Sequence, residues 1–280
     1  MELRLGDVRV RVLSDGLFSL DGGAMFGVVP RALWEKTDPP DERNRVRLGL
    51  NVALVETAGR RVLVDTGMGD KWSDKEREMF ALDRSATLAT SLASCGLGPE
   101  DIDVVVNTHL HFDHAGGNTV AGGGPLVPAF PRARYVVQKG EWEDARRPHE
   151  RNRASYRPEN FVPVAERGQL DLVEGETEVA PGVRVVPVGG HTAHHQAVLV
   201  EGGGAALFVP TDLVPTTSHL PLPFIMSYDL FPVGTLEAKR RWLARAADEG
   251  WWVLFYHDPR RPLGRIGRAD GRFVVREGEA

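Results

Sequence analysis

The sequence predicts a mixed α/β protein made of two similar halves. Runs in which apolar and polar residues alternate, as in half-buried strands, gather in one group near the start of the chain and in another beyond its middle. Each group is followed by a segment with helical spacing and then by a short, strongly apolar run. This repeated order of meander, helix and strand predicts a single domain over residues 1–280, with halves at about 1–165 and 166–280.

The first half is expected to begin with a meander of strands. Residues 8–12 alternate strictly, and residues 51–57 and 61–65 give two further strands around a glycine-containing turn. A long connection, residues 21–48, separates the first strand from the second. Connections of this length within a compact domain tend to be functional, so the segment is expected to be a lid, a binding loop or a homodimer contact.

A helix and a buried strand are expected to follow the meander. The helix is predicted over residues 83–93, where Leu88 and Leu92 stand four positions apart and Gly96 would end the segment. The strand is the apolar run at residues 102–106.

The elements after residue 130 follow the same rules. Strands are predicted at 133–138, 183–188, 196–201, 205–209, 251–256 and 272–276, where β-branched and other apolar residues concentrate. Helices are predicted at 140–147 and 235–249, and in the longer one Leu236, Leu243 and Ala247 recur at helical spacing.

The composition is that of a soluble globular protein, with 42% hydrophobic and 26% charged residues. The net charge is −5 and no Lys/Arg block is present, so nucleic acid is not an expected partner. The first residues lack the pattern of a signal peptide and no apolar stretch approaches about 18 residues, so we expect no membrane association and a cytoplasmic location. The single cysteine, Cys95, excludes an intrachain disulfide and a multi-cysteine metal cluster.

The most informative segment carries four potential metal ligands within six residues: His109, His111, Asp113 and His114. Imidazole and carboxylate together suit zinc, iron, manganese or cobalt. Alternate residues of an extended chain share a side, so the first three can converge, and His114 joins them if the chain turns near Asp113. The cluster directly follows the apolar run at 102–106, which predicts a metal site at the end of a strand.

The second half supplies three further ligand candidates, His191, Asp212 and His257. Each of them stands shortly after a predicted strand ends. Open α/β sheets place their ligands beyond the ends of their strands, so four strand exits can meet in one pocket that holds two metals.

These residues together resemble the metallo-β-lactamase fold superfamily. The resemblance rests on the His109-x-His111-x-Asp113-His114 element, on the preceding segment 64–67, and on the segments that contain the three later candidates. Its landmarks span residues 51–257. It implies a four-layer αββα sandwich of two pseudo-symmetric halves, with a binuclear metal site on one edge.

The resemblance also implies roles for individual residues. One metal is expected on His109, His111 and His191, the other on Asp113, His114 and His257, and Asp212 would bridge them. Asp65 matches a carboxylate that orients a ligand imidazole through its second nitrogen. The expected cofactors are two divalent metal ions, zinc before iron, manganese or cobalt.

The bridging carboxylate separates this chain from the true β-lactamases, which typically lack it. Asp212 instead favours lactonase, esterase, phosphodiesterase or glyoxalase-like relatives, and the ligand intervals resemble the branch of acyl-homoserine lactonases and methyl-parathion-type hydrolases. Two positions depart from the pattern. His194 stands where the family usually has glycine, and Pro215 stands where well-known homoserine lactonases have a tyrosine.

The expected function is hydrolysis of a small-molecule substrate, in which a metal-bridging hydroxide attacks an ester or lactone carbonyl. Asp113 is the candidate catalytic residue, because it could pass a proton to the leaving alkoxide. The candidate substrate pocket comprises Met25, Phe26, His194, His219, Phe224 and Met226. Phosphodiester or phosphotriester hydrolysis uses the same ligands and is the alternative. A di-iron redox protein and a non-catalytic metal-binding module are the alternatives of other classes.

Overall fold

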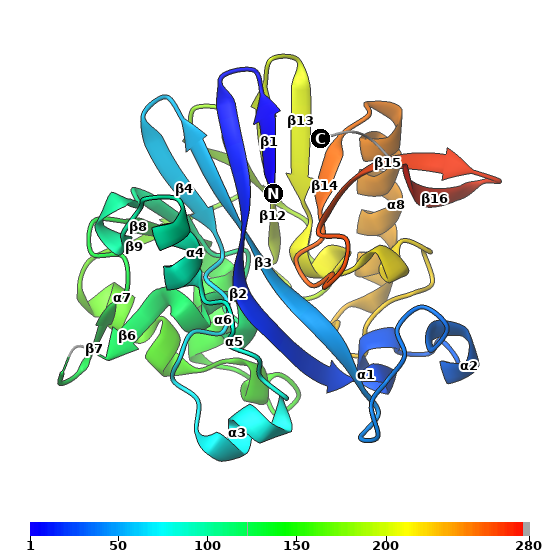
Figure 1. The fold of residues 1–280 in the computed structure, drawn as a ribbon, viewed down its shortest axis with the longest axis horizontal. Coiled ribbons are helices and arrows are strands. Elements are labelled where there is room, and N and C mark those ends of the chain that lie inside the picture. Colours follow the sequence, from blue (N-terminus) through cyan, green and yellow to red (C-terminus); the bar gives the residue numbers. More distant parts are fainter. Residues whose placement is uncertain (122, 277–280) are drawn as a thin grey trace.

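The computed structural model describes residues 1–121 and 123–276. Within these residues the chain forms two seven-stranded sheets that face each other, and a two-stranded ribbon (Figure 1). The chain passes from the first sheet to the second between Val173 and Thr177. The placement of the two halves at about 1–165 and 166–280, in one domain, stays a prediction.

The first sheet joins an antiparallel part to a parallel part. Its strands, in spatial order, are β1 (Glu2–Leu5), β2 (Val8–Asp21), β3 (Arg45–Thr57), β4 (Arg60–Val64), β5 (Val104–Val106), β8 (Arg134–Gln138) and β9 (Leu170–Val173). Neighbours from β1 to β4 pair antiparallel, whereas β4, β5, β8 and β9 pair parallel. The parallel strands therefore end at the same edge of the sheet.

The second sheet has its parallel pair in the middle. Its strands, in spatial order, are β10 (Thr177–Ala180), β11 (Val183–Pro187), β12 (Gln196–Gly202), β13 (Ala205–Val209), β14 (Trp252–Leu254), β15 (Leu263–Ala269) and β16 (Arg272–Arg276). Only β13 and β14 pair parallel among the described strands of this sheet. The ribbon consists of β6 (Thr119–Ala121) and β7 (Leu126–Pro128).

Helices cover the outer faces of both sheets. The α-helices are α1 (Gly22–Phe26), α2 (Arg31–Trp34), α3 (Asp74–Met79), α4 (Leu88–Ser94), α5 (Phe112–Ala115), α6 (Lys139–Arg146), α7 (Val162–Glu166) and α8 (Pro232–Asp248). Short 3-10 turns are η1 (Pro99–Asp101), η2 (Gly116–Asn118), η3 (Arg153–Ser155), η4 (Pro158–Asn160), η5 (Thr211–Leu213) and η6 (Thr217–His219). In Figure 1, α4 and α6 lie on the side of the first sheet and α8 on the side of the second.

The core shows why the order of layers is helix, sheet, sheet, helix. Val62 of the first sheet and Val198 of the second belong to one buried cluster, so the inner faces of the two sheets pack against each other. A second cluster joins Trp242 of α8 to Phe208 on the outer face of the second sheet, and their rings stack at 5.1 Å. A third joins α6 and α7 to Val137 of β8. The predicted four-layer αββα sandwich is confirmed.

The expected long connection at residues 21–48 is shorter than predicted. Strands β2 and β3 continue as one long hairpin, in which Asp21 pairs with Arg45, so residues 22–44 alone connect them. A break in register between Ser14 and Leu17 interrupts the alternation and hides the second part of β2 in the sequence. Within the connection, Met25 and Phe26 are buried in the core.

Most of the predicted elements agree with the structure to within a few residues, and the differences have local causes. The helix predicted at 83–93 begins at Leu88, because Asp83 instead exchanges backbone hydrogen bonds with Leu17. Several shorter elements were not predicted, among them helix α3 and the strands β1, β9, β10 and β15. The capping box of α3, in which Ser73 and Glu76 bond each other's backbone, was a sequence signal for its start.

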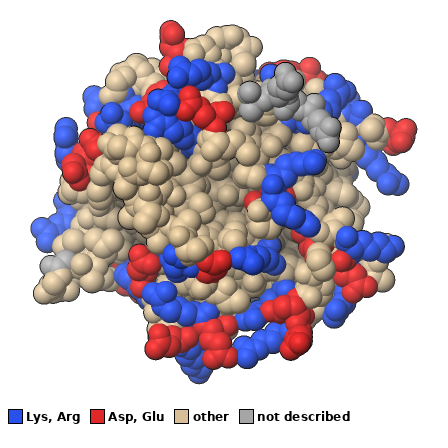
Figure 2. Space-filling view, in the orientation of Figure 1, with Lys and Arg blue, Asp and Glu red and all other residues tan. Residues whose placement is uncertain are grey.

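The surface carries basic and acidic side chains side by side. Figure 2 shows them interspersed over one face of the molecule. Many form ion pairs, such as Arg43 with Glu78 at 2.8 Å and Arg47 with Asp83 at 2.7 Å. Each exposed pair adds little to stability. Among the described helices, none combines the length and the apolar character that crossing a bilayer requires.

A buried lysine fixes the segment that connects η6 to α8. Lys239 of α8 is fully buried, and its Nζ donates to the backbone carbonyl oxygens of His219, Pro221 and Phe224 at 2.6, 3.0 and 2.7 Å. Three carbonyl groups of a non-regular segment thus find their hydrogen-bond donor on the helix. The ammonium group determines where this segment lies against α8.

Lys239→Met is expected to lower the free energy of unfolding by on the order of 3 kcal/mol, because each buried acceptor left without a donor costs about 1–3 kcal/mol. Urea denaturation measures the change. Lys75→Met, at an exposed position of α3, is the control and should stay within about 0.5 kcal/mol of the unaltered chain. Equal midpoints for the two variants would contradict the proposed role of Lys239.

Candidate metal centre

The predicted ligands lie at strand exits on one edge of the molecule. His109 and His111 follow β5, and helix α5 begins directly after His111. That single helical turn carries Asp113 and brings His114 back beside His109, with ring centroids 4.1 Å apart. The expected turn near Asp113 is therefore a short helix.

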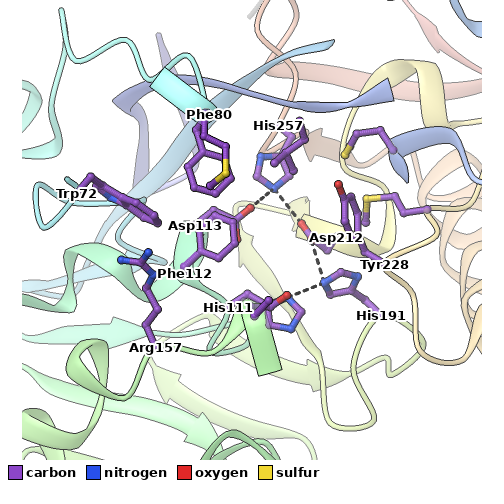
Figure 3. A pocket seen from close by; sticks show the side chains of 16 residues that line it. Trp72, Phe80, His111, Phe112, Asp113, Arg157, His191, Asp212, Tyr228 and His257 are labelled. Carbon is purple, nitrogen blue, oxygen red and sulfur yellow. Dashed lines mark hydrogen bonds and ion pairs between the residues drawn. The ribbon is translucent and has the colours of Figure 1, made fainter. Parts of the chain in front are cut away.

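The remaining three candidates come from the second sheet. His191 lies in the loop from β11 to β12, Asp212 lies in η5 after β13, and His257 follows β14. Figure 3 shows His111, Asp113, His191, Asp212 and His257 pointing into one space. The structure thus brings residues from four strand exits together.

Their ligand atoms form three compact groups. His109, His111 and His191 make the first, His109, His114 and Asp212 the second, and Asp113, His114 and His257 the third. Within each group the ligand atoms lie within 4.8 Å of one another. All seven side chains are buried.

Asp212 stands between the outer two groups. Its Oδ1 lies 3.1 Å from Nε2 of His114 and 3.2 Å from Nε2 of His257. Its Oδ2 lies 3.1 Å from Nε2 of His191 and 3.9 Å from Nε2 of His109. The two oxygens of one carboxylate therefore face opposite groups of imidazoles, which is the geometry of a bridging ligand.

Several polar atoms of the cluster need a partner that the protein does not provide. His109 Nε2 is buried without a hydrogen-bond partner among the described residues. Nδ1 of His111 and Nε2 of His191 face each other at 3.0 Å, although both are acceptors in the tautomers that bind metal. Buried polar atoms without partners are costly. Divalent cations would satisfy them, so the residues present fit a metal centre.

Hydrogen bonds fix how three of the imidazoles are turned. Nδ1 of His114 donates to Asp65 Oδ2 at 2.8 Å, and Nδ1 of His191 donates to Asp229 Oδ1 at 2.8 Å. Nδ1 of His257 donates to the carbonyl oxygen of Gly49 at 2.9 Å. Each bond leaves Nε2 as the free acceptor that faces the cluster.

The charges of the cluster shift its pKa values in opposite directions. Burial opposes a charge on Asp212, yet the imidazoles of His114, His191 and His257 hold its pKa well below the usual value. Burial likewise opposes a charge on His114, but the carboxylates around it raise its pKa well above the usual value. Burial and the neighbouring histidines lower the pKa of His109, which favours the neutral imidazole that binds metal.

The sequence matches a known family over most of its length. The family model described as the metallo-beta-lactamase superfamily matches residues 46–257. The chain belongs to this superfamily. The resemblance inferred from the His109–His114 element and its partners is thereby confirmed.

Similar proteins within the superfamily include lactonases and metal-dependent hydrolases. An N-acyl homoserine lactonase of Bacillus cereus is 31% identical over 181 residues, an alignment that covers 60% of this chain and 64% of the lactonase. The chain thus spans a little under two thirds of that relative's length. A probable metallo-hydrolase of Mycobacterium tuberculosis is 27% identical, with 84% of this chain and 85% of the relative covered.

Solved structures of similar proteins extend the comparison. The crystal structure of a probable metal-dependent hydrolase from Staphylococcus aureus has a TM-score of 0.90 and 32% identity, and covers 99% of this chain and 100% of that one. The dizinc quorum-quenching lactonase AidC has a TM-score of 0.83 and 19% identity, with 100% and 97% covered. At that identity the likeness to AidC shows the fold.

In this member of the metallo-β-lactamase superfamily, a cavity of about 310 Å³ opens onto the cluster. One wall is aromatic. Trp72 packs edge-on against Phe80 at 5.3 Å and against Phe112 at 5.5 Å. Arg157 covers the ring of Trp72, with its guanidinium carbon 4.0 Å from the ring centroid, and forms an ion pair with Glu76. Figure 3 shows this wall on one side of the ligand candidates and Tyr228 on the other.

Two of the six predicted pocket residues, Met25 and Met226, line this cavity. The other four lie elsewhere. Phe26 stacks on the buried His219 at 4.7 Å, and Phe224 packs edge-on against Phe26 at 6.2 Å, so these three rings pack with one another. His194 lies at the surface with 48% of its side chain exposed, 3.9 Å from Asp144.

Several residues of the site were not predicted from the sequence. Asp229 had no motif around it, and Trp72, Phe80 and Arg157 come from segments without a periodic pattern. Phe112 was within reach of a prediction, because it stands between His111 and Asp113 and the turn of α5 sends it towards the aromatic wall.

Asp65→Asn is expected to weaken metal binding about 10–100-fold, since the bond from His114 Nδ1 to a carboxylate orients that imidazole and increases its basicity. Competition with a chelator, combined with elemental analysis, measures the affinity and the number of ions per chain. Asp7→Asn, in an exposed turn, serves as the control. Unchanged affinity in the Asp65 variant would show that the carboxylate is not needed to orient His114.

Proposed function

We propose that this chain is a metal-dependent hydrolase that cleaves an ester or lactone with two divalent ions. His109, His111 and His191 would hold one ion, Asp113, His114 and His257 the other, and Asp212 both. The observation that carries the proposal is the placement of Asp212, whose two carboxylate oxygens face the two outer groups of ligand candidates. The names of the similar lactonases and metal-dependent hydrolases support it.

The chemistry is divided between the ions and the protein. When bound, divalent ions polarise a carbonyl group and lower the pKa of water, and zinc is the ion that we favour. The chain supplies and orients the ligands, and all seven of their side chains are buried. A serine or cysteine nucleophile is then not required.

Asp113 is the residue that we assign to proton transfer. Its carboxylate lines the cavity, and its Oδ2 lies 3.6 Å from His257 Nε2 and 3.9 Å from His114 Nε2. It therefore reaches both the cluster and the space where a substrate would lie. From there it can hold a proton and deliver it to the leaving alkoxide.

The lining of the cavity favours a neutral substrate with an apolar arm. Leu20, Trp72, Met79, Phe80, Phe112 and Met226 provide apolar surface. Arg157 is the only Lys or Arg among the described lining residues, and its charge is compensated by Glu76. Beyond the metal ions themselves, a phosphodiester anion would find no uncompensated cation among the described lining residues, whereas an acyl chain would bury apolar area.

A substrate screen of the metal-loaded chain tests the proposal. Acyl-homoserine lactones and aryl esters are expected to be hydrolysed, and removal of the metal with a chelator should abolish the activity until zinc is restored. His114→Ala should be inactive, whereas His149→Ala, at an exposed position, should match the unaltered chain. Turnover of phosphotriesters or phosphodiesters alone would replace the ester assignment. Bound metal without any hydrolysis would favour a redox or binding function.

Asp113→Asn is expected to lower kcat about 10²–10⁴-fold in the metal-replete protein and to change KM far less, because the amide cannot carry the proton. Steady-state kinetics with the best lactone or ester, together with metal analysis, measures this. Asp74→Asn, on the exposed side of α3, is the control. Near-normal turnover of a fully loaded Asp113 variant would exclude the proton-transfer role.

A further inference from the structure

Glu141 is a buried carboxylate that the proposed reaction does not use. It lies in α6 and is fully buried, and no Lys or Arg among the described residues forms an ion pair with it. Burial raises the pKa of this carboxyl group, against the hydrogen bonds that it accepts. Burying a carboxylate costs free energy unless hydrogen bonds compensate for the lost hydration. The hydrogen-bond donors to Glu141 show which part of the molecule it supports.

All three donors to Glu141 belong to the surroundings of the first group of ligand candidates. The backbone N–H of Leu110, between His109 and His111, donates to Oε1 at 3.0 Å. The hydroxyl of Thr192, next to His191, donates to Oε2 at 2.6 Å. Glu141 thus joins a loop of the first sheet to a loop of the second.

Tyr156 is the third donor, and it continues the same support. Its hydroxyl donates to Glu141 Oε1 at 2.9 Å. Its ring packs edge-on against the imidazole of His111, with centroids 4.8 Å apart, and its backbone bridges to that of His111. Glu141 therefore supports His111 in two ways, through the backbone of Leu110 and through the ring of Tyr156.

The ligand candidates of the other side have different supports. Asp65 holds His114, and the carbonyl oxygen of Gly49 holds His257. Within the described residues, the donors to Glu141 are Leu110, Tyr156 and Thr192, and none of them is bonded to the side chain of Asp113, His114 or His257. Asp65 supports both sides, because it also accepts from Thr108, whose hydroxyl lies 3.2 Å from Nδ1 of His109, whereas the bonds of Glu141 stay on the first side.

We propose that Glu141 is a positioning residue for one ion alone, the ion held by His109, His111 and His191. This inference rests on the proposed function, since it assumes that the cluster holds two ions. By fixing the loop of Leu110 against the loop of Thr192, Glu141 sets the distance between the two histidines of the first sheet and His191. The Asp113, His114 and His257 side does not depend on it.

Two backgrounds separate the sites. His257→Ala disables the second site and leaves the first, and His191→Ala disables the first and leaves the second. In each background the metal-free full chain is titrated with Co²⁺ in competition with a chelator, and the visible absorption of bound Co²⁺ reports its coordination. The unaltered chain is titrated alongside.

Glu141→Ala is expected to lower Co²⁺ affinity about 10–100-fold in the His257→Ala background and less than about twofold in the His191→Ala background. Glu141→Gln should restore most of the affinity, because its amide can accept from Leu110 and Tyr156 while the hydroxyl of Thr192 rotates to accept in turn. Glu143→Ala, on the exposed side of the same helix, is the control.

Milder variants keep the inference testable if Glu141→Ala fails to fold. Tyr156→Phe and Thr192→Val each remove one donor and should weaken the first site several-fold, whereas Thr192→Ser should not. Equal losses in both backgrounds, or none in either, would overturn the inference and leave the proposed function standing. An unaltered chain that binds no metal would overturn both.

Discussion

The interaction between the carboxylate of Asp212 and the imidazoles around it is the one on which the rest of the site depends. A carboxylate buried at the junction of two sheets is stable only among groups that favour its ionised form, and three imidazoles surround it within 3.2 Å. Those imidazoles are in turn bonded to Asp65, Asp229 and the backbone of Gly49. Each polar group of the centre is therefore stabilised by another one, and divalent ions would satisfy the ligand atoms that still lack a partner.

The backbone is strained at two residues next to this centre. Asp65 and Thr211 both adopt left-handed conformations, with φ of 62° and 43°, which residues with a side chain seldom do. Asp65 is held there by bonds from Thr108 and His114. Thr211 is held by the ring of His195, at 2.8 Å from its hydroxyl. Both strained residues adjoin or support the ligand candidates, so the packed sheets behind them maintain the geometry of the site.

The sequence predicted those parts of the site that depend on local spacing. The alternation of His109, His111 and Asp113 and the strand exits before His191, Asp212 and His257 are properties of short segments, and the sheet topology makes them converge. The pocket wall depends instead on packing between distant segments. Trp72 and Arg157 meet through a ring and a guanidinium group from different loops, and Phe26 and His219 stack with each other away from the cavity. Neither contact produces a periodic pattern in the sequence from which it could be predicted. The hydrogen bonds of Glu141 and Lys239 were not predicted for the same reason.

Anomalous diffraction from crystals grown with Zn²⁺ is the most direct measurement of the central claim, that seven side chains from both sheets hold two ions. The account predicts two anomalous peaks per chain on either side of Asp212, about 3.5–4 Å apart. One peak is expected among His109, His111 and His191, and the other among Asp113, His114 and His257. A single peak, or two peaks without contact to Asp212, would contradict it.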